Sequence, residues 1–182
     1  MIAFQVWAEA WLRSFTGVAA FMQQQWSWPV AESVHFVGLT LLLGAIATWD
    51  LRLVGFMKQA PAAAFHKLIP VAVAGFTLNA VTGALFLMTF PDQYVYNAAF
   101  HVKLLCLLLA GLNVLVFYMT TFRRLSTQGA GEQAPVLGRI SGALSVALWI
   151  SVIVCGRMIT FLRPSPCAPG EAAGLIAQCI VR

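Results

Sequence analysis

Four long apolar segments constrain this chain more than any other feature of its sequence. They run over residues 28–56, 68–90, 98–122 and 140–162. Each is longer than the roughly 20 residues that an α-helix needs to cross the hydrocarbon core of a bilayer. A spanning segment must satisfy its backbone hydrogen bonds without water, and a helix does so within itself. The sequence therefore predicts an all-α integral membrane protein.

The composition agrees with a membrane protein. Charged residues make up 9% of the chain and hydrophobic residues 60%, whereas a soluble domain carries about a quarter charged residues. The mean hydropathy is +0.84. We therefore read the net charge of +5 through its distribution between loops, and not as a sign of nucleic-acid binding.

Short connections join the apolar segments, over residues 57–67, 91–97 and 123–139. Helices that are joined by short loops lie antiparallel beside each other. We therefore expect one antiparallel four-helix bundle over residues 28–163, followed by a C-terminal tail over residues 164–182.

Residues 1–27 precede the bundle as a predicted amphipathic helix. Trp7 and Trp11 recur at a helical interval, and Glu9 and Arg13 lie on another face. A tryptophan-rich amphipathic helix lies in the plane of the membrane interface. The alternative is a signal peptide, but the start of the chain lacks basic residues and Glu9 interrupts its apolar stretch.

The basic residues predict the orientation of the bundle. Six of them flank the first and third connections: Arg52, Lys58, Lys67, Arg123, Arg124 and Arg139. Because cytoplasmic loops carry an excess of Lys and Arg, we expect both chain termini on the opposite side. For a bacterial inner membrane that side is the periplasm.

The four cysteines divide by location. Cys106 and Cys155 fall inside apolar segments, where we expect small packing residues. Cys167 and Cys179 fall in the tail, on the oxidising side of the membrane. That side permits a disulfide between them, and the sequence leaves open whether they are bonded.

Four ionisable residues lie at one predicted level near the outer ends of three helices. They are Glu32, His35, Lys103 and Arg157. Charges at such a depth need compensation, and the excess of positive charge suits an anionic group such as a haem propionate, a carboxylate substrate or a lipid headgroup. In the alternative, the two cations extend to lipid headgroups and the acid pairs with one of them.

His35 is the leading candidate for a cofactor ligand, because neutral imidazole binds transition metals and haem iron. His101 lies at a matching depth on the diagonal helix. The two histidines predict either a bis-histidine haem or, with Glu32, a metal site with two histidines and one carboxylate. The helical phase argues against both sites. His101 shares its face with an apolar stripe, whereas the small and polar stripe that we expect to point inward holds Lys103, Cys106, Ala110 and Asn113.

Other polar residues inside the predicted helices have a structural interpretation. Asn79 and Asn113 fall near the middle of the membrane, where asparagine side chains hydrogen-bond between helices. Asp50 and Arg52 predict a charged pair at the cytoplasmic end of the first helix. Small residues recur along the second and fourth helices and predict close helix packing, either within one chain or between copies.

Four motifs carry a resemblance to a known family. They are W-x-W-P-x-x-E-S-x-H-F-x-G from Trp26, D-L-R-L-x-G from Asp50, N-x-x-F-x-x-K from Asn97 and G-R-x-I-x-F from Gly156. The chain resembles an uncharacterised bacterial family of four-helix inner-membrane proteins. In size and helix count it is similar to copper-resistance membrane proteins and to small b-type cytochromes. Those cytochromes use several histidines that this chain lacks, which argues against two haems.

The sequence favours a redox or metal-associated membrane protein with a periplasm-facing cofactor site around His35. The cofactor would be a b-type haem or a transition metal, with Lys103 and Arg157 holding an anionic group or a quinone-type ligand. Glu32 would orient the imidazole or carry a proton. The alternative is a non-enzymatic membrane subunit or small-solute carrier, whose charges serve anion binding or assembly into a homo-oligomer or larger complex. The chain has no motif for nucleotide binding or for a hydrolase nucleophile.

Overall fold

The computed structural model describes residues 2–57, 59–125, 129, 131–168 and 179–180. Four long helices run antiparallel along its long axis: α3 (Ser27–Val54), α5 (Ile69–Thr89), α7 (Ala98–Thr120) and α9 (Val136–Met158). Each of the four is long and apolar enough to cross a membrane. The predicted all-α multi-pass membrane bundle is therefore confirmed.

The fourth long helix differs most from its predicted bounds. It begins at Val136 and ends at Met158, about one turn before the predicted span at each end. Pro135 directly precedes it, and the fixed backbone of proline favours the start of a helix at the next residue. At the other end, the side chain of Asn97 donates to the backbone oxygens of Ile159 (3.1 Å) and Leu162 (2.9 Å).

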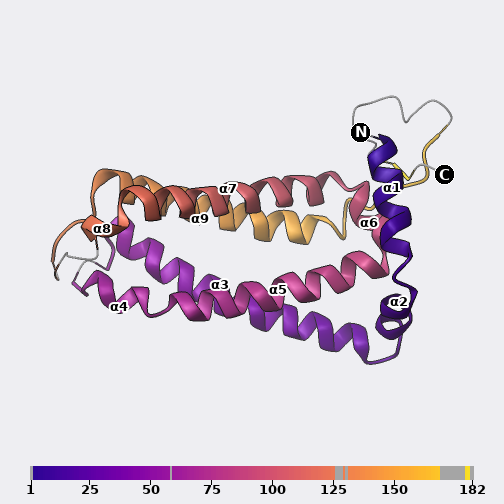
Figure 1. Ribbon diagram of the computed structural model, residues 1–182, viewed down its shortest axis with the longest axis horizontal. Coiled ribbons are helices and arrows are strands. Elements are labelled where there is room, and N and C mark those ends of the chain that lie inside the picture. The colour runs from indigo at the N-terminus through magenta and orange to yellow at the C-terminus, as the bar shows by residue number, and fades with distance from the viewer. Residues whose placement is uncertain (1, 58, 126–128, 130, 169–178, 181–182) are drawn as a thin grey trace.

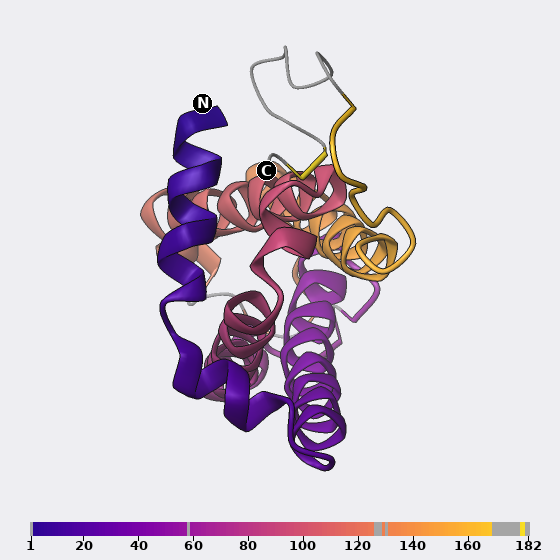
Figure 2. The same ribbon diagram turned by 90° about the vertical axis from the view of Figure 1, so that its right-hand side faces the viewer.

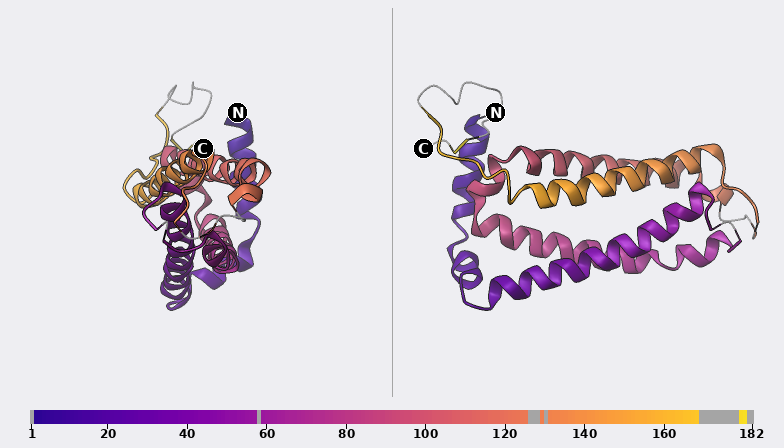
Figure 3. Two further views of the ribbon diagram at one scale, coloured as in Figure 1. Left: turned by 90° about the vertical axis from the view of Figure 1, so that its left-hand side faces the viewer. Right: turned by 180° about the vertical axis from the view of Figure 1, so that it is seen from behind.

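The four helices form two pairs, α3 with α5 and α7 with α9, and α3 also packs against α9. Figure 1 shows that α3 runs diagonally: its C-terminal end approaches α9, and its N-terminal end lies far from it. The view from behind in Figure 3 shows the same divergence. The two pairs therefore separate toward the end of the bundle where α1 lies, which we call the α1 end.

Glycine contacts set the closest helix crossings. A Cβ atom placed on Gly75 would lie 2.6 Å from the backbone oxygen of Gly38, and one placed on Gly142 would lie 2.8 Å from Cβ of Leu53. No side chain fits at such distances without a shift of the neighbouring helix. The predicted small-residue surfaces of α5 and α9 thus pack within this chain, against α3.

The interior of the bundle is filled by apolar side chains from all four long helices. Its central cluster consists of Leu42, Ala45, Ala72, Ala110, Leu148, Trp149 and Val152. On the opposite face of α7, Leu105 and Leu108 are 54% and 69% exposed. Such a face is stable only against lipid, so the predicted inward and outward stripes of this helix are both present.

The predicted single N-terminal helix is two helices, α1 (Ile2–Arg13) and α2 (Thr16–Met22). They are separated at Ser14, whose hydroxyl donates to the backbone oxygen of Trp11 at 2.6 Å. Such a local bond competes with the backbone bonds of a continuing helix. Figure 2 shows α1 and α2 running across the ends of the long helices, with α1 beside α6 (Pro91–Val95).

Short elements complete the two ends of the bundle. The helices α4 (Ala62–His66) and α8 (Phe122–Leu125) lie at the end opposite α1. At the α1 end, a disulfide joins Cys167 to Cys179. Ile180 then packs against a buried cluster of α1 and α6 residues, so this part of the tail is attached to the bundle.

Candidate functional site

His35 is held by a hydrogen bond to the neighbouring helix. Its Nδ1 atom lies 2.7 Å from Oγ1 of Thr82 on α5. The same Oγ1 lies 2.7 Å from the backbone oxygen of Leu78, which can only accept. The threonine hydroxyl therefore donates to Leu78 and accepts from Nδ1–H of His35. In the neutral ring this leaves Nε2 with a free lone pair.

Aromatic side chains surround the imidazole on the α5 side. The ring centroids of His35 and Phe86 are 5.6 Å apart, and Trp28 packs against Phe86 at 4.8 Å. Gly83 lies one turn before Phe86 on α5, and a Cβ atom placed on it would lie 4.0 Å from Cε1 of His35. The ring is thus fixed by packing and by one hydrogen bond. Nε2 has no hydrogen-bond partner among the residues that the structure describes.

Lys103 approaches this region from the other helix pair. It is half-buried on α7, and its Nζ atom lies 3.8 Å from the place of a Cβ atom on Gly156 of α9. The ammonium group therefore lies at van der Waals distance from the surface of α9 at Gly156. The lysine charge is close enough to act on His35, and within the described residues no carboxylate lies within 4.0 Å of Nζ.

Glu32 lies one turn before His35 on α3, with an exposed side chain. The carboxylate of Glu32 acts on Tyr94 of α6. Burial raises the pKa of the Tyr94 phenol, and the negative charge of Glu32 raises it further. In the described part of the chain, Glu32 forms no ion pair with Lys103 or Arg157. The alternative prediction of such a pair is therefore wrong for these residues.

Arg157 lies apart from this group. Its side chain is exposed, and the guanidinium carbon lies 5.1 Å from the ring centroid of Phe161. Arginine stacks on aromatic rings in this way at exposed positions. The structure thus brings Lys103 toward His35, places Glu32 at the edge of the same region, and leaves Arg157 on the periphery.

His101 is half-buried on α7, and its one recorded ring contact is with the adjacent Phe100. No group of three metal-ligating His, Cys, Asp or Glu side chains occurs among the described residues. The predicted metal site with two histidines and one carboxylate is therefore not assembled from Glu32, His35 and His101. A haem ligated by His35 and His101 stays a prediction.

The two asparagines in the membrane differ in their partners. Asn113 exchanges two hydrogen bonds of 3.0 Å with Ser141 of α9, one to its backbone oxygen and one from its hydroxyl. Asn79 instead donates to the backbone oxygen of Gly75 in its own helix at 3.0 Å. Its predicted bond between helices is not formed, because the residue of α3 that packs against its amide is Gly38, which has no side chain.

Asp50 and Arg52 do not form the predicted pair. Asp50 is buried and faces Ser145 of α9, and its Oδ2 atom has no hydrogen-bond partner among the described residues. Arg52 is fully buried and donates to the backbone oxygens of Ala60 (2.8 Å) and Glu132 (3.3 Å). Residues two apart on a helix point in different directions, so each of these side chains joins α3 to a different neighbour.

Two residues that position the site were not identified from the sequence. One is Thr82, which fixes the tautomer of His35. The other is Asn97, whose Oδ1 accepts from the backbone nitrogens of Ala99 and Phe100 and caps the start of α7. This cap and the bonds of Asn97 to the end of α9 fix the start of α7 against α9. They thereby set the position of Lys103 along the axis of the bundle. An asparagine directly before an apolar run is a helix-start signal that would have identified the cap.

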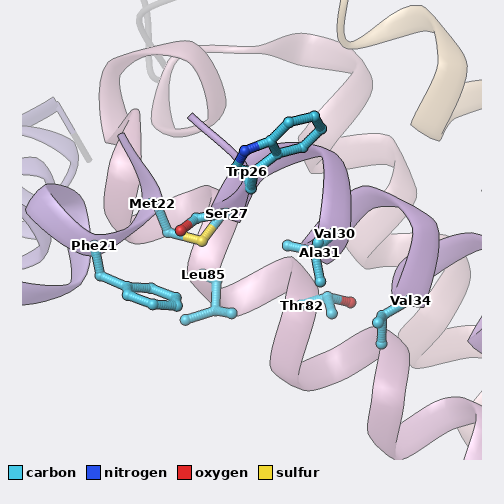
Figure 4. Close-up of a pocket in the computed structure, with 9 residues that line it drawn as sticks. All are labelled: Phe21, Met22, Trp26, Ser27, Val30, Ala31, Val34, Thr82 and Leu85. Atoms are coloured by element: carbon cyan, nitrogen blue, oxygen red, sulfur yellow. The ribbon is translucent and has the colours of Figure 1, made fainter. Parts of the chain in front are cut away.

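A groove lies on the outer side of the α3–α5 pair, beside α2. Figure 4 shows its lining side chains, which include Met22, Ser27, Ala31, Val34, Thr82 and Leu85. Its volume is about 370 Å³. Thr82 lines this groove and also bonds His35, so the groove and the histidine region meet at one side chain.

Comparison with known proteins gives a family and no activity. No curated protein and no solved structure matches the chain. A family model matches residues 4–162, and the family is described as one of unknown function (DUF6644). The match includes all four long helices, His35 and Lys103. The chain therefore belongs to this family of unknown function.

Proposed function

We propose that this protein is a membrane-embedded redox protein that binds a quinone-type cofactor between His35 and Lys103. The observation that carries this proposal is the hydrogen bond from Nδ1–H of His35 to Thr82. It leaves Nε2 as a hydrogen-bond acceptor, while Lys103 supplies an ammonium donor from the other helix pair. One acceptor and one donor are thus available from opposite sides.

A quinone and its reduced form match these two groups. The hydroxyl of a quinol can donate to an imidazole lone pair, and the carbonyl oxygen of a quinone can accept from an ammonium group. Oxidation of the quinol to the quinone would release two protons and two electrons. Nε2 of His35 would accept the proton of the hydroxyl bound to it, the second proton would pass to water at the membrane surface, and both electrons would pass to a haem-containing redox partner in the same membrane.

The basic residues support a periplasmic position for this site in a bacterial inner membrane. Arg123, Arg124 and Arg139 lie at the end of the bundle opposite α1, where the cytoplasm is expected. His35 lies in the half of α3 nearer to α1. A ligand bound there would exchange protons with the periplasmic side.

The second candidate is a b-type haem with His35 as an axial ligand. A metal-ligating histidine usually donates its other ring N–H to a fixed oxygen, which orients the ring and strengthens the ligand. Thr82 fills this role for His35. The ammonium of Lys103 would then face a haem propionate.

One experiment separates these candidates. The protein is purified in mild detergent, its absorption spectrum is recorded oxidised and reduced, and bound quinone is measured after solvent extraction. We expect quinone in stoichiometric amount, with loss in His35→Ala and in Lys103→Ala. Arg157→Ala is the matched control, because this exposed cation lies at the same end of the bundle but away from the site.

The outcomes are distinct. A Soret band that sharpens on reduction and disappears in His35→Ala would favour the haem. A wild-type protein that carries neither chromophore nor quinone, and that binds no added quinone, would overturn the proposal. That result would favour the alternative function, a cofactor-free membrane subunit or a small-solute carrier.

A further inference from the structure

The groove beside α2 has apolar walls. Ser27 and Thr82 bring the hydroxyl groups among its lining side chains. The hydroxyl of Thr82 is already occupied by His35 and Leu78. An ordered water needs two to four polar partners, and these walls do not provide them. The groove therefore suits a hydrocarbon group.

The groove follows the direction of a lipid chain. It begins at α2 and Ser27, the first residue of α3, and reaches Val34 and Thr82 along the crevice between α3 and α5. Seven residues of helix separate Ser27 from Val34, which corresponds to roughly 10 Å along the helix axis. Because both helices can cross the membrane, the groove extends from one membrane surface into the adjacent leaflet.

The surface around the groove is continuous with the lipid-facing surface of the bundle. Val30 at its rim is 58% exposed, and Val81 on the neighbouring turn of α5 is 56% exposed. Apolar side chains with this exposure on membrane-spanning helices contact lipid. The helix α2 crosses the outer end of the groove, so a straight helix from a second copy, about 10 Å wide, would collide with it. A single hydrocarbon chain is narrower than a helix, so it would fit along the walls of the groove beside α2.

We propose that this groove binds one acyl chain of a phospholipid from the leaflet at the α1 end. The chain packs against the carbon atoms of Ala31, Val34 and Thr82. By holding Thr82 in place it supports the hydrogen bond from Thr82 to His35. The groove is therefore a lipid site that lies behind the candidate cofactor site and shares one wall with it.

Native mass spectrometry of the detergent-purified protein tests this site. Delipidated wild-type protein is titrated with phosphatidylglycerol, and we expect one lipid to bind before any others. Ala31→Leu and Val34→Phe fill the groove and should lose this first lipid. Val37→Phe is the matched control, because Val37 is an exposed residue of the same helix that does not line the groove. It should bind the lipid as the wild type does.

Thr82→Val separates this proposal from the proposed function. Valine keeps the shape of threonine, so the variant should retain the lipid while it loses the hydrogen bond to His35. Equal lipid binding in the groove-filling variants and in Val37→Phe would overturn the lipid site. So would a graded series of adducts in the wild type without a preferred first one, a quinone adduct that the groove-filling variants lose, or a dimer that the groove-filling variants dissociate.

Discussion

His35 shows how a single hydrogen bond can define what a residue is able to do. Without Thr82 the imidazole would exchange its proton between two nitrogens, and either could face a ligand. When the Thr82 hydroxyl donates to the backbone oxygen of Leu78, 2.7 Å away, it can only accept from His35, and Nδ1 carries the proton in this arrangement. The chemistry of the proposed cofactor site thus depends on a threonine that does not touch the cofactor itself.

Replacing Thr82 by valine tests this dependence. We expect the affinity for the cofactor to fall about fivefold, because one hydrogen bond contributes on the order of 1 kcal/mol. The fold should be retained. Thr77→Val on the same helix is the control, because its hydroxyl likewise bonds the carbonyl four residues earlier, that of Val73. Equal ligand affinities in the two variants, measured by titration, would contradict the role of Thr82.

Tyr96 gives a prediction for high pH. Burial, with a smaller effect of the nearby Glu9 carboxylate, raises the pKa of Tyr96 from 10.0 to about 12. Between these values the folded protein keeps a proton that the unfolded chain has lost. The free energy of unfolding therefore decreases as the pH rises from about 10 to about 12.

The unfolding midpoint as a function of pH, compared between the wild type and Tyr96→Phe, measures this contribution. The variant has no phenol at this position, so its midpoint should fall less steeply above pH 10. Parallel curves for the two proteins would show that Tyr96 does not contribute.

At the scale of the helices, glycine decides how closely α3 and α5 approach. Gly75 has no space for a Cβ atom, because the backbone oxygen of Gly38 would lie 2.6 Å away. Gly111 on α7 has nothing within 4 Å of the same position. Both residues lie inside helices, so the same substitution has opposite effects at the two sites.

We expect Gly75→Ala to destabilise the protein by about 1–3 kcal/mol, the usual cost of overpacking. Gly111→Ala should be neutral or stabilising by up to about 1 kcal/mol, because alanine favours the helix. Thermal unfolding in detergent compares the two variants. A similar midpoint for both would mean that α3 can move away from α5 at little cost.

At the scale of the whole molecule, the first and the last residues that the structure describes lie at the same end of the bundle. The start of α1 and the Cys167–Cys179 disulfide both lie at the α1 end, whereas α4 and α8 lie at the other (Figure 1). The basic residues around α8 predict a cytoplasmic position for that other end. The proposed site would then lie near the periplasmic surface.

Single cysteines at Ser14 and Gln59 test this orientation, because both residues are exposed and lie at opposite ends. A membrane-impermeant maleimide should label Ser14→Cys in intact cells and Gln59→Cys after permeabilisation. Labelling of Gln59→Cys alone in intact cells would reverse the orientation and move the site to the cytoplasmic side.

The sequence by itself determined the four spanning helices, their antiparallel order and the inward face of α7. Hydropathy and helical period carry this information, because each depends on residues of one helix. It also placed His35 and Lys103 at one level, since depth follows from counting along a helix.

Only the tertiary structure decided which side chains meet. The bond from His35 to Thr82, the exposure of Arg157 and the return of Asn79 to its own helix depend on the distances between helices. Those distances are set by Gly75 and Gly142 on one side and by the divergence of α3 on the other. A helix pattern gives the direction of a side chain but not the separation of its neighbours, and hydrogen bonds depend on that separation within tenths of an ångström.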